Sequence, residues 1–68
     1  MQESNENIIL TSREIIVLKL VSKGCSNKQI ADRLFISTET VKKHLQNTYR
    51  KLGAFNKIDA LRKAQMIN

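Results

Sequence analysis

STETVKKHLQNTYRKL, residues 37–52, is the stretch that decides the fold. Read as a helix at about 100° per residue, it separates into an apolar side and a polar side. The apolar side carries Val41, Leu45 and Leu52, together with Thr48. The polar side presents hydrogen-bonding groups: Glu39, Lys42, Lys43, Gln46, Asn47 and Arg50. Such a helix can bury one side against other helices and turn the other side toward water or a polar partner.

The polar side of this helix suits DNA. Lys, Gln, Asn and Arg side chains can donate hydrogen bonds to purine edges in the major groove, and the cations among them can also hold phosphates. An ordinary solvated surface is the alternative, because Lys and Gln are common on exposed helices. The stretch alone leaves both interpretations open, so the rest of the chain has to decide between them.

Composition indicates one small helical domain with a polyanionic partner. The 68 residues include no proline and two glycines, which favours helices over a sheet. Residues 1–36 have a net charge of +1 and residues 37–68 one of +5. Nucleic acid fits this asymmetry better than a membrane, because no apolar run approaches the roughly 18 residues that a membrane span needs. Residues 1–7 do not resemble a signal peptide, so we expect a cytoplasmic location without membrane contact.

The residue types that enzymes and metal sites need are sparse. Cys25 is the only cysteine and His44 the only histidine, so one chain cannot supply the four Cys or His ligands of a structural zinc site. The sequence has no phosphate-cradling glycine loop and no clustered carboxylate pair, and a domain of this size rarely forms a deep cleft. We therefore expect no enzyme activity, metal or cofactor, and we interpret Cys25 as a half-buried packing thiol.

Capping residues divide the chain into four helices. Two capping boxes, one single cap and one variant box can be placed: Thr11 with Glu14, Ser26 with Gln29, Ser37, and Asn56 with Asp59. Gly24 and Gly53 each stop a helix. We predict an all-α fold with helices over residues 12–22, 27–34, 38–52 and 57–66. The domain covers residues 10–68 after a polar tail over residues 1–9, and Phe35 and Ile36 are expected to be buried turn residues.

The second and third helices have the lengths and spacing of a helix-turn-helix, in which the second member enters the major groove and the first lies across the backbone. At these residues the chain resembles the LuxR-type helix-turn-helix domains. The likeness spans residue 10 to about residue 64. It rests on LTSRE at 10–14, VLKLVSKG at 17–24, SNKQIADRL at 26–34, IS at 36–37, TVKKHLQN at 40–47, YRKLG at 49–53, and on Asn56, Ala60 and Ala64.

The resemblance implies a four-helix bundle that binds DNA and regulates transcription, usually as the output end of a longer chain such as a response regulator. It places base contacts at Lys42, Lys43 and Gln46, with Asn47 as an addition. It places phosphate contacts near Ser26, Asn27, Lys28, Thr38, Thr40 and His44. We expect Arg50, a further cation on the polar side, to contact a phosphate as well. The physical reading agrees at the second helix, because free N–H groups at a helix start favour a phosphate, although Ser26 can also serve only as a cap.

The resemblance also implies that the last helix pairs with its symmetry mate in a dimer. We expect Ile58, Leu61 and Gln65 to form that contact, and the small residues Ala60 and Ala64 permit close helix approach. The expected partners are therefore double-stranded DNA, a second copy of the chain, and RNA polymerase.

Three sites depart from the family pattern. Ile15 and Ile16 replace residues that are usually charged, and they either extend the core or form a docking patch. Phe55 is expected to fill the volume that Ala54 leaves. Thr48 replaces an aliphatic residue, and its hydroxyl is expected to bond back to a carbonyl one turn earlier.

Two alternatives to this function remain at the level of sequence. LTSRE, SNKQIADRL and ISTETVKKHL also resemble region 4 of bacterial sigma factors, which reads a promoter element within RNA polymerase. The tail LGAFNKIDALRKA argues for the LuxR-type domain, because region 4 lacks this fourth helix. The other alternative is a protein-interaction module whose basic surface meets an acidic partner.

Overall fold

The computed structural model describes residues 9–66, except for the side chain of Met66. This part of the chain contains four helices joined by short turns. They are α2 (Ser12–Ser22), α3 (Asn27–Leu34), α4 (Thr38–Leu52) and α5 (Lys57–Met66). The predicted all-α fold and the four predicted helix ranges are confirmed. The expected polar tail lies outside the described residues except for Ile9. Among the helices in residues 9–66, none has the length and apolar character to cross a membrane.

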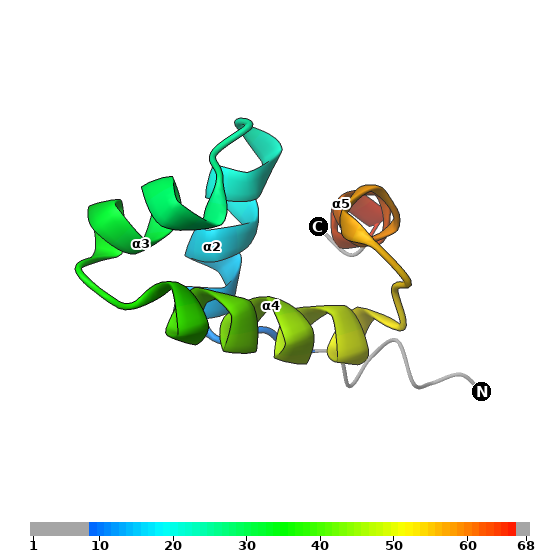
Figure 1. The fold of residues 1–68 in the computed structure, drawn as a ribbon. Helices are drawn as coiled ribbons and strands as arrows, with labels where there is room; N and C mark the ends of the chain where they lie inside the picture. Colours follow the sequence, from blue (N-terminus) through cyan, green and yellow to red (C-terminus); the bar gives the residue numbers. More distant parts are fainter. Residues whose placement is uncertain (1–8, 67–68) are drawn as a thin grey trace.

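The four helices surround a core shared by α2 and α4. These two helices contact each other, and α3 and α5 each pack against both of them. In Figure 1, α4 runs along one side of the molecule, with α3 near its first turns and α5 near its last turns. Within residues 9–66, the long helix α4 is therefore packed against other helices on one side and exposed on the other.

The helix starts form because polar side chains satisfy the unpaired backbone N–H groups there. Thr11 Oγ1 accepts from Glu14 N at 3.1 Å and Glu14 Oε1 accepts from Thr11 N at 2.9 Å, which completes the predicted capping box. The box of Ser26 and Gln29 is likewise complete. The two remaining starts are capped by Ser37, which accepts from Thr40 N, and by Asn56, which accepts from Asp59 N.

The core consists of two clusters joined by a shared neighbour. The first contains Val17, Val21, Ile30, Ala31 and Val41, from α2, α3 and α4. The second contains Leu18, Leu52 and Ala60, from α2, α4 and α5. Leu61 packs against both clusters. The first cluster fixes α3 on α4, so the angle within the helix-turn-helix depends on it.

Thr48 lies fully buried among these residues on the inner side of α4. Its hydroxyl donates to the carbonyl oxygen of His44 at 2.7 Å, which confirms the predicted back-bond. The hydrogen bond satisfies a polar group that would otherwise be buried without a partner.

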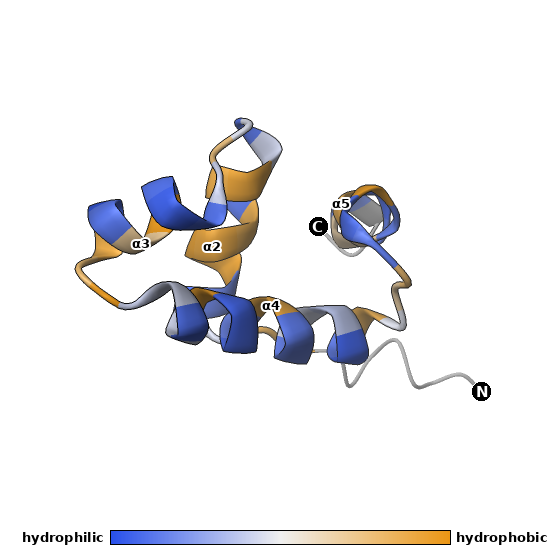
Figure 2. Cartoon of the chain, viewed as in Figure 1, coloured by the Kyte–Doolittle hydropathy of each residue, from blue (hydrophilic) through white to orange (hydrophobic). Residues whose placement is uncertain are grey.

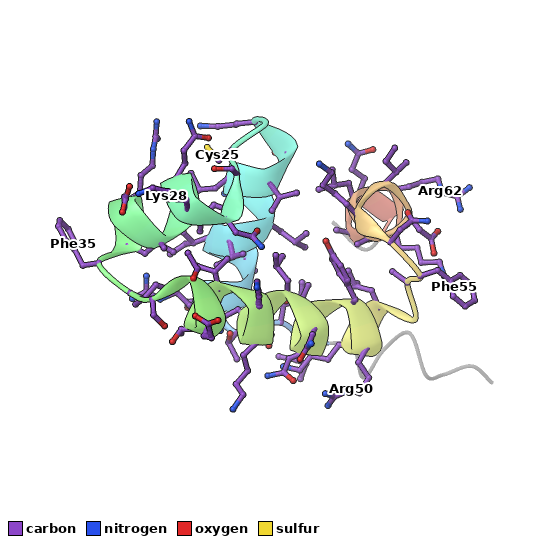
Figure 3. All side chains as sticks on the ribbon, in the orientation of Figure 1. Cys25, Lys28, Phe35, Arg50, Phe55 and Arg62 are labelled. Atoms are coloured by element: carbon purple, nitrogen blue, oxygen red, sulfur yellow. The ribbon has the colours of Figure 1, made fainter. Side chains whose placement is uncertain are left out.

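The prediction that Phe35 is a buried turn residue is wrong. Phe35 ends α3 in the left-handed conformation, with φ of 58°, and its side chain is 94% exposed. Figure 3 shows it projecting away from the other helices. A left-handed residue reverses the direction of the chain, so the helical periodicity that places Leu34 inward no longer applies one residue later. Only Ile36 of the predicted pair contributes to the core, as a half-buried neighbour of the first cluster.

The prediction that Phe55 fills the volume beside Ala54 is also wrong. Ala54 itself packs against the second cluster, whereas the Phe55 side chain is 92% exposed. The N–H of Phe55 donates to Asp59 Oδ2 at 3.1 Å as part of the start of α5. This backbone contact holds the turn, and the ring lies outside, 5.9 Å from the Lys63 ammonium.

Two further sequence interpretations concern residues outside the fully buried core. Ile15 and Ile16 are about equally exposed, at 42% and 41%, so neither joins the buried core. Cys25 is half-buried and packs against the first cluster, in agreement with a packing role for its thiol.

A buried carboxylate links the start of α2 to the end of α4. Glu14 is 3% exposed, and its Oε1 accepts from Lys51 Nζ at 2.9 Å as well as from Thr11 N. Burial alone would raise the pKa of Glu14, but the Lys51 ammonium and the Thr11 N–H outweigh burial and lower it. Lys51 also donates to the Ile9 carbonyl at 3.3 Å. One lysine therefore fixes α2, α4 and the segment before α2.

We expect Lys51→Met to lower the free energy of unfolding most strongly near neutral pH. With a lowered pKa, Glu14 stabilises the folded chain above the ordinary carboxyl range, and this contribution is lost as the pH falls through its folded pKa. The stability gap between Lys51→Met and the unmodified chain should therefore narrow as the pH falls. Urea unfolding at a series of pH values from 7 to about 3 measures the gap. Lys19→Met removes an exposed lysine of α2 and should show no such narrowing.

Candidate nucleic-acid interface

The outward side of α4 carries the side chains predicted to contact bases. Lys42, Lys43 and Gln46 are exposed and Asn47 is partly exposed, whereas Val41 on the opposite side is fully buried. Figure 2 shows the same division, with the hydrophilic side of α4 turned away from α2 and α3. The burial of the apolar side thus leaves a continuous row of donors in solvent. This is the arrangement that the 100° periodicity indicates.

The first turn of α4 places two partly exposed hydroxyl groups beside this row. Thr40 Oγ1 lies 2.9 Å from the Ser37 hydroxyl, and Thr38 Oγ1 donates to Glu39 Oε1 at 3.2 Å. Both threonines can offer a hydroxyl to a phosphate. The exposed Glu39 carboxylate repels a phosphate at this end of the helix. The Thr38 hydroxyl can therefore contact a phosphate only if it gives up its hydrogen bond to Glu39.

The start of α3 supplies a second group of predicted phosphate contacts. Ser26 and Lys28 are exposed and Asn27 is partly exposed. The capping box uses the N–H of Ser26 and that of Gln29, whereas the N–H groups of Asn27 and Lys28 have no partner within the helix by position. These two N–H groups, the positive end of the helix dipole and the Lys28 ammonium all favour an anion.

His44 lies at the edge between the two sides of α4. Its side chain is partly exposed, and its carbonyl oxygen accepts from the Thr48 hydroxyl. The imidazole has access to solvent beside the outward row, which leaves it able to hydrogen-bond a phosphate.

Asn47 and Arg50 form a contact that the sequence analysis did not identify. Arg50 Nη2 donates to Asn47 Oδ1 at 3.0 Å, across one turn of α4. Figure 3 shows Arg50 projecting from α4 on the side away from α2. The spacing of three residues is the signal that could have revealed this pair. Its effect is to fix the orientation of a side chain in the outward row.

The three residues predicted for the dimer contact differ in how free they are. Ile58 is 75% exposed and Gln65 is exposed, but Leu61 is half-buried between the two core clusters. Ile58 is therefore the residue of the three with the most apolar surface left to bury.

A short helix supported by the core, a tight turn, and a longer helix with an exposed row of donors define a DNA-binding domain of the helix-turn-helix class. Comparison with known proteins agrees with this class. Residues 8–64 match the family of bacterial regulatory proteins of the luxR type, and the chain belongs to this family. The predicted LuxR-type resemblance is confirmed, and with it the assignment to DNA-binding domains of transcription regulators.

Two individual proteins illustrate the match. The chain is 50% identical over 58 residues to a nitrate/nitrite response regulator protein homolog of Haemophilus influenzae, covering 85% of this chain and 28% of that protein. It is 45% identical to the response regulator ChrA of a heme-sensing two-component system, whose crystal structure it matches with a TM-score of 0.82. That match covers 85% of this chain and 29% of ChrA. The chain thus spans less than a third of either relative.

Proposed function

We propose that this domain binds double-stranded DNA sequence-specifically and regulates transcription as a dimer on paired half-sites. In this proposal α4 enters the major groove and α3 lies across the backbone. The observation that carries it is the outward side of α4, where donors remain exposed while the opposite side is buried against the core. RNA polymerase is the partner through which a regulator bound near a promoter acts.

The side chains divide into two groups by the contact they make. Base edges are contacted by the outward row: Lys42, Lys43, Gln46 and Asn47. Phosphates are contacted by the start of α3, the first turns of α4 and one later cation: Ser26, Asn27, Lys28, Thr38, Thr40, His44 and Arg50. Base contacts give specificity, whereas phosphate contacts give affinity and fix the orientation of the domain.

The relatives support a place for the domain within a larger regulator. Both are named as response regulators, and each is more than three times as long as the region matched here. We therefore propose that the domain serves as the output part of a response regulator, with the signal received elsewhere in the protein.

We expect Lys43→Ala and Gln46→Ala each to lower the affinity for a specific site by about 1–3 kcal/mol and to affect random DNA much less. Both side chains are exposed on α4, so neither substitution should unfold the domain. The measurement is a titration of each variant against a site selected from a random pool and against a random duplex. Equal losses on the two duplexes would reassign these residues to phosphate contacts.

The dimer part of the proposal rests on α5. A single copy reads one half-site through about four side chains, whereas two copies related by a twofold axis read two half-sites about 10 base pairs apart and gain affinity through their linkage. Ile58 offers exposed apolar surface at the start of α5, and Leu61 and Gln65 follow along the helix. Burial of Ile58 against a second copy would remove this surface from water.

We expect Ile58→Glu to leave the domain folded and single half-site binding nearly unchanged, but to abolish cooperative occupancy of paired half-sites. Ile58 is 75% exposed, so its loss costs the core little. Because glutamate also adds a negative charge that weakens DNA binding generally, Ile58→Ser is the control. Band-shift titrations on single and paired half-sites measure the cooperativity. If both variants retain it, the dimer surface lies elsewhere.

A further inference from the structure

The contact between Arg50 and Asn47 fixes which atoms of Asn47 remain free. A guanidinium group only donates hydrogen bonds, so the atom of Asn47 that faces Arg50 at 3.0 Å is the carbonyl oxygen Oδ1. The Nδ2 amino group lies on the other side of the carboxamide carbon and is therefore directed away from Arg50. On the side away from Arg50, Asn47 thus presents the donor Nδ2 to a neighbour, and not the acceptor Oδ1.

The free groups of the pair suit one base edge in the major groove better than the others. Guanine presents two acceptors there, N7 and O6, which can take both hydrogens of the Nδ2 amino group. Adenine presents one acceptor beside an amino donor, thymine one acceptor beside a methyl group, and cytosine an amino donor. A bidentate contact between Asn47 and adenine requires Oδ1 to accept from the adenine amino group. The second lone pair of Oδ1 can accept this bond, but the partly positive amino group would then lie beside the Arg50 cation, which repels it. The two acceptors of guanine avoid this repulsion.

The position of the pair brings it to the DNA if α4 enters the major groove. Asn47 follows Gln46 on the outward side, and Arg50 is exposed one turn later. In water an exposed hydrogen bond between side chains contributes little, but exclusion of water from a protein–DNA interface strengthens it. The orientation seen in the free domain is therefore the one that binding reinforces.

We propose that Arg50 is a positioning residue that orients the Asn47 carboxamide, and that Asn47 so oriented selects guanine. The inference rests on the proposed entry of α4 into the major groove. It adds a role for Arg50 that acts through Asn47, distinct from any contact of Arg50 with a phosphate. A phosphate contact affects all sequences alike, whereas an orienting contact affects the preference at one base pair.

The test is a selection from duplexes with a randomised central segment, carried out with the 68-residue chain and three variants. Asn47→Ala identifies the base pair that Asn47 reads, because the preference of this variant for guanine should be about tenfold weaker at that base pair than the preference of the unmodified chain. Arg50→Ala should lower the guanine preference at that same base pair about as much and raise the share of adenine, because the released carboxamide can turn. Arg13→Ala removes an exposed arginine of α2 and should leave every base preference unchanged.

Each contrary outcome has a separate meaning. If Arg50→Ala weakens binding to all duplexes while guanine stays preferred at the base pair that Asn47 reads, Arg50 is only a phosphate contact and the inference fails. If the unmodified chain prefers adenine at that base pair, the assigned orientation is wrong. If the unmodified chain enriches no sequence at all, the proposed sequence-specific function fails together with this inference.

Discussion

Ile30→Ala should remove about 2–5 kcal/mol from the free energy of unfolding and leave the domain largely unfolded at 25 °C. Ile30 is fully buried in the cluster that joins α3 to α2 and α4. Its truncation leaves a cavity where the two helices of the helix-turn-helix meet. A core of this size rarely supplies more than about 3–5 kcal/mol in total, so the loss is comparable to the whole stability of the domain.

Leu45→Ala is the matched comparison for this prediction. Leu45 packs against the same cluster but remains half-buried, so less apolar surface returns to water and a smaller cavity forms. We expect a clearly smaller loss than for Ile30→Ala. Urea unfolding followed by helical circular dichroism measures both variants. An Ile30→Ala variant as stable as Leu45→Ala would mean that the α3–α4 contact described here is not the one that holds the domain together.

The helix boundaries could be predicted because each start depends on residues close together in the sequence. Thr11 and Glu14, three residues apart, form reciprocal hydrogen bonds that need no information about the rest of the chain. The same holds for Ser26 with Gln29, and Gly53 ends α4 in the left-handed conformation that glycine favours. Local chemistry of this kind sets the helices before any tertiary contact is considered.

The two exposed phenylalanines could not be placed from the sequence, because hydrophobic periodicity stops at a helix end. Phe35 and Phe55 both lie in turns, where the direction of a side chain depends on backbone angles and not on spacing. Hydrophobicity alone suggested burial, yet both rings are more than nine-tenths exposed. A non-glycine residue in the left-handed region, such as Phe35, carries no reliable signal in a single sequence.

The candidate interface was predictable in outline but not in its connections. Periodicity alone put Lys43 and Gln46 on the outward side of α4, and the structure leaves both exposed. Within the interface, the contact of Arg50 with Asn47 was not predicted, although its spacing of three residues allows one. Outside the interface, the contact of Glu14 with Lys51 joins residues that are 37 positions apart, so only the folded arrangement reveals it. The contacts of individual side chains with DNA remain predictions, which the variants proposed above address.

The salt dependence of DNA binding tests the central claim most directly. Two cations of the proposed phosphate contacts, Lys28 and Arg50, are exposed in each chain. Each phosphate that a cation neutralises adds about −0.9 to the slope of log affinity against log salt. Two such contacts predict that raising the salt from about 50 to 200 mM weakens binding of one chain to a random duplex about 10-fold, and of a dimer about 100-fold.

Substitution of single lysines makes this measurement specific to the proposed surface. Lys28→Gln should make the slope shallower by about one, because it removes one phosphate contact. Lys19→Gln removes an exposed lysine on α2, outside the proposed interface, and should leave the slope unchanged. The decisive measurement is therefore the salt slope of the unmodified chain, compared with the slopes of these two variants. A steep slope that only Lys28→Gln reduces supports DNA binding through α3 and α4. A flat slope, or a slope that both variants reduce equally, contradicts it.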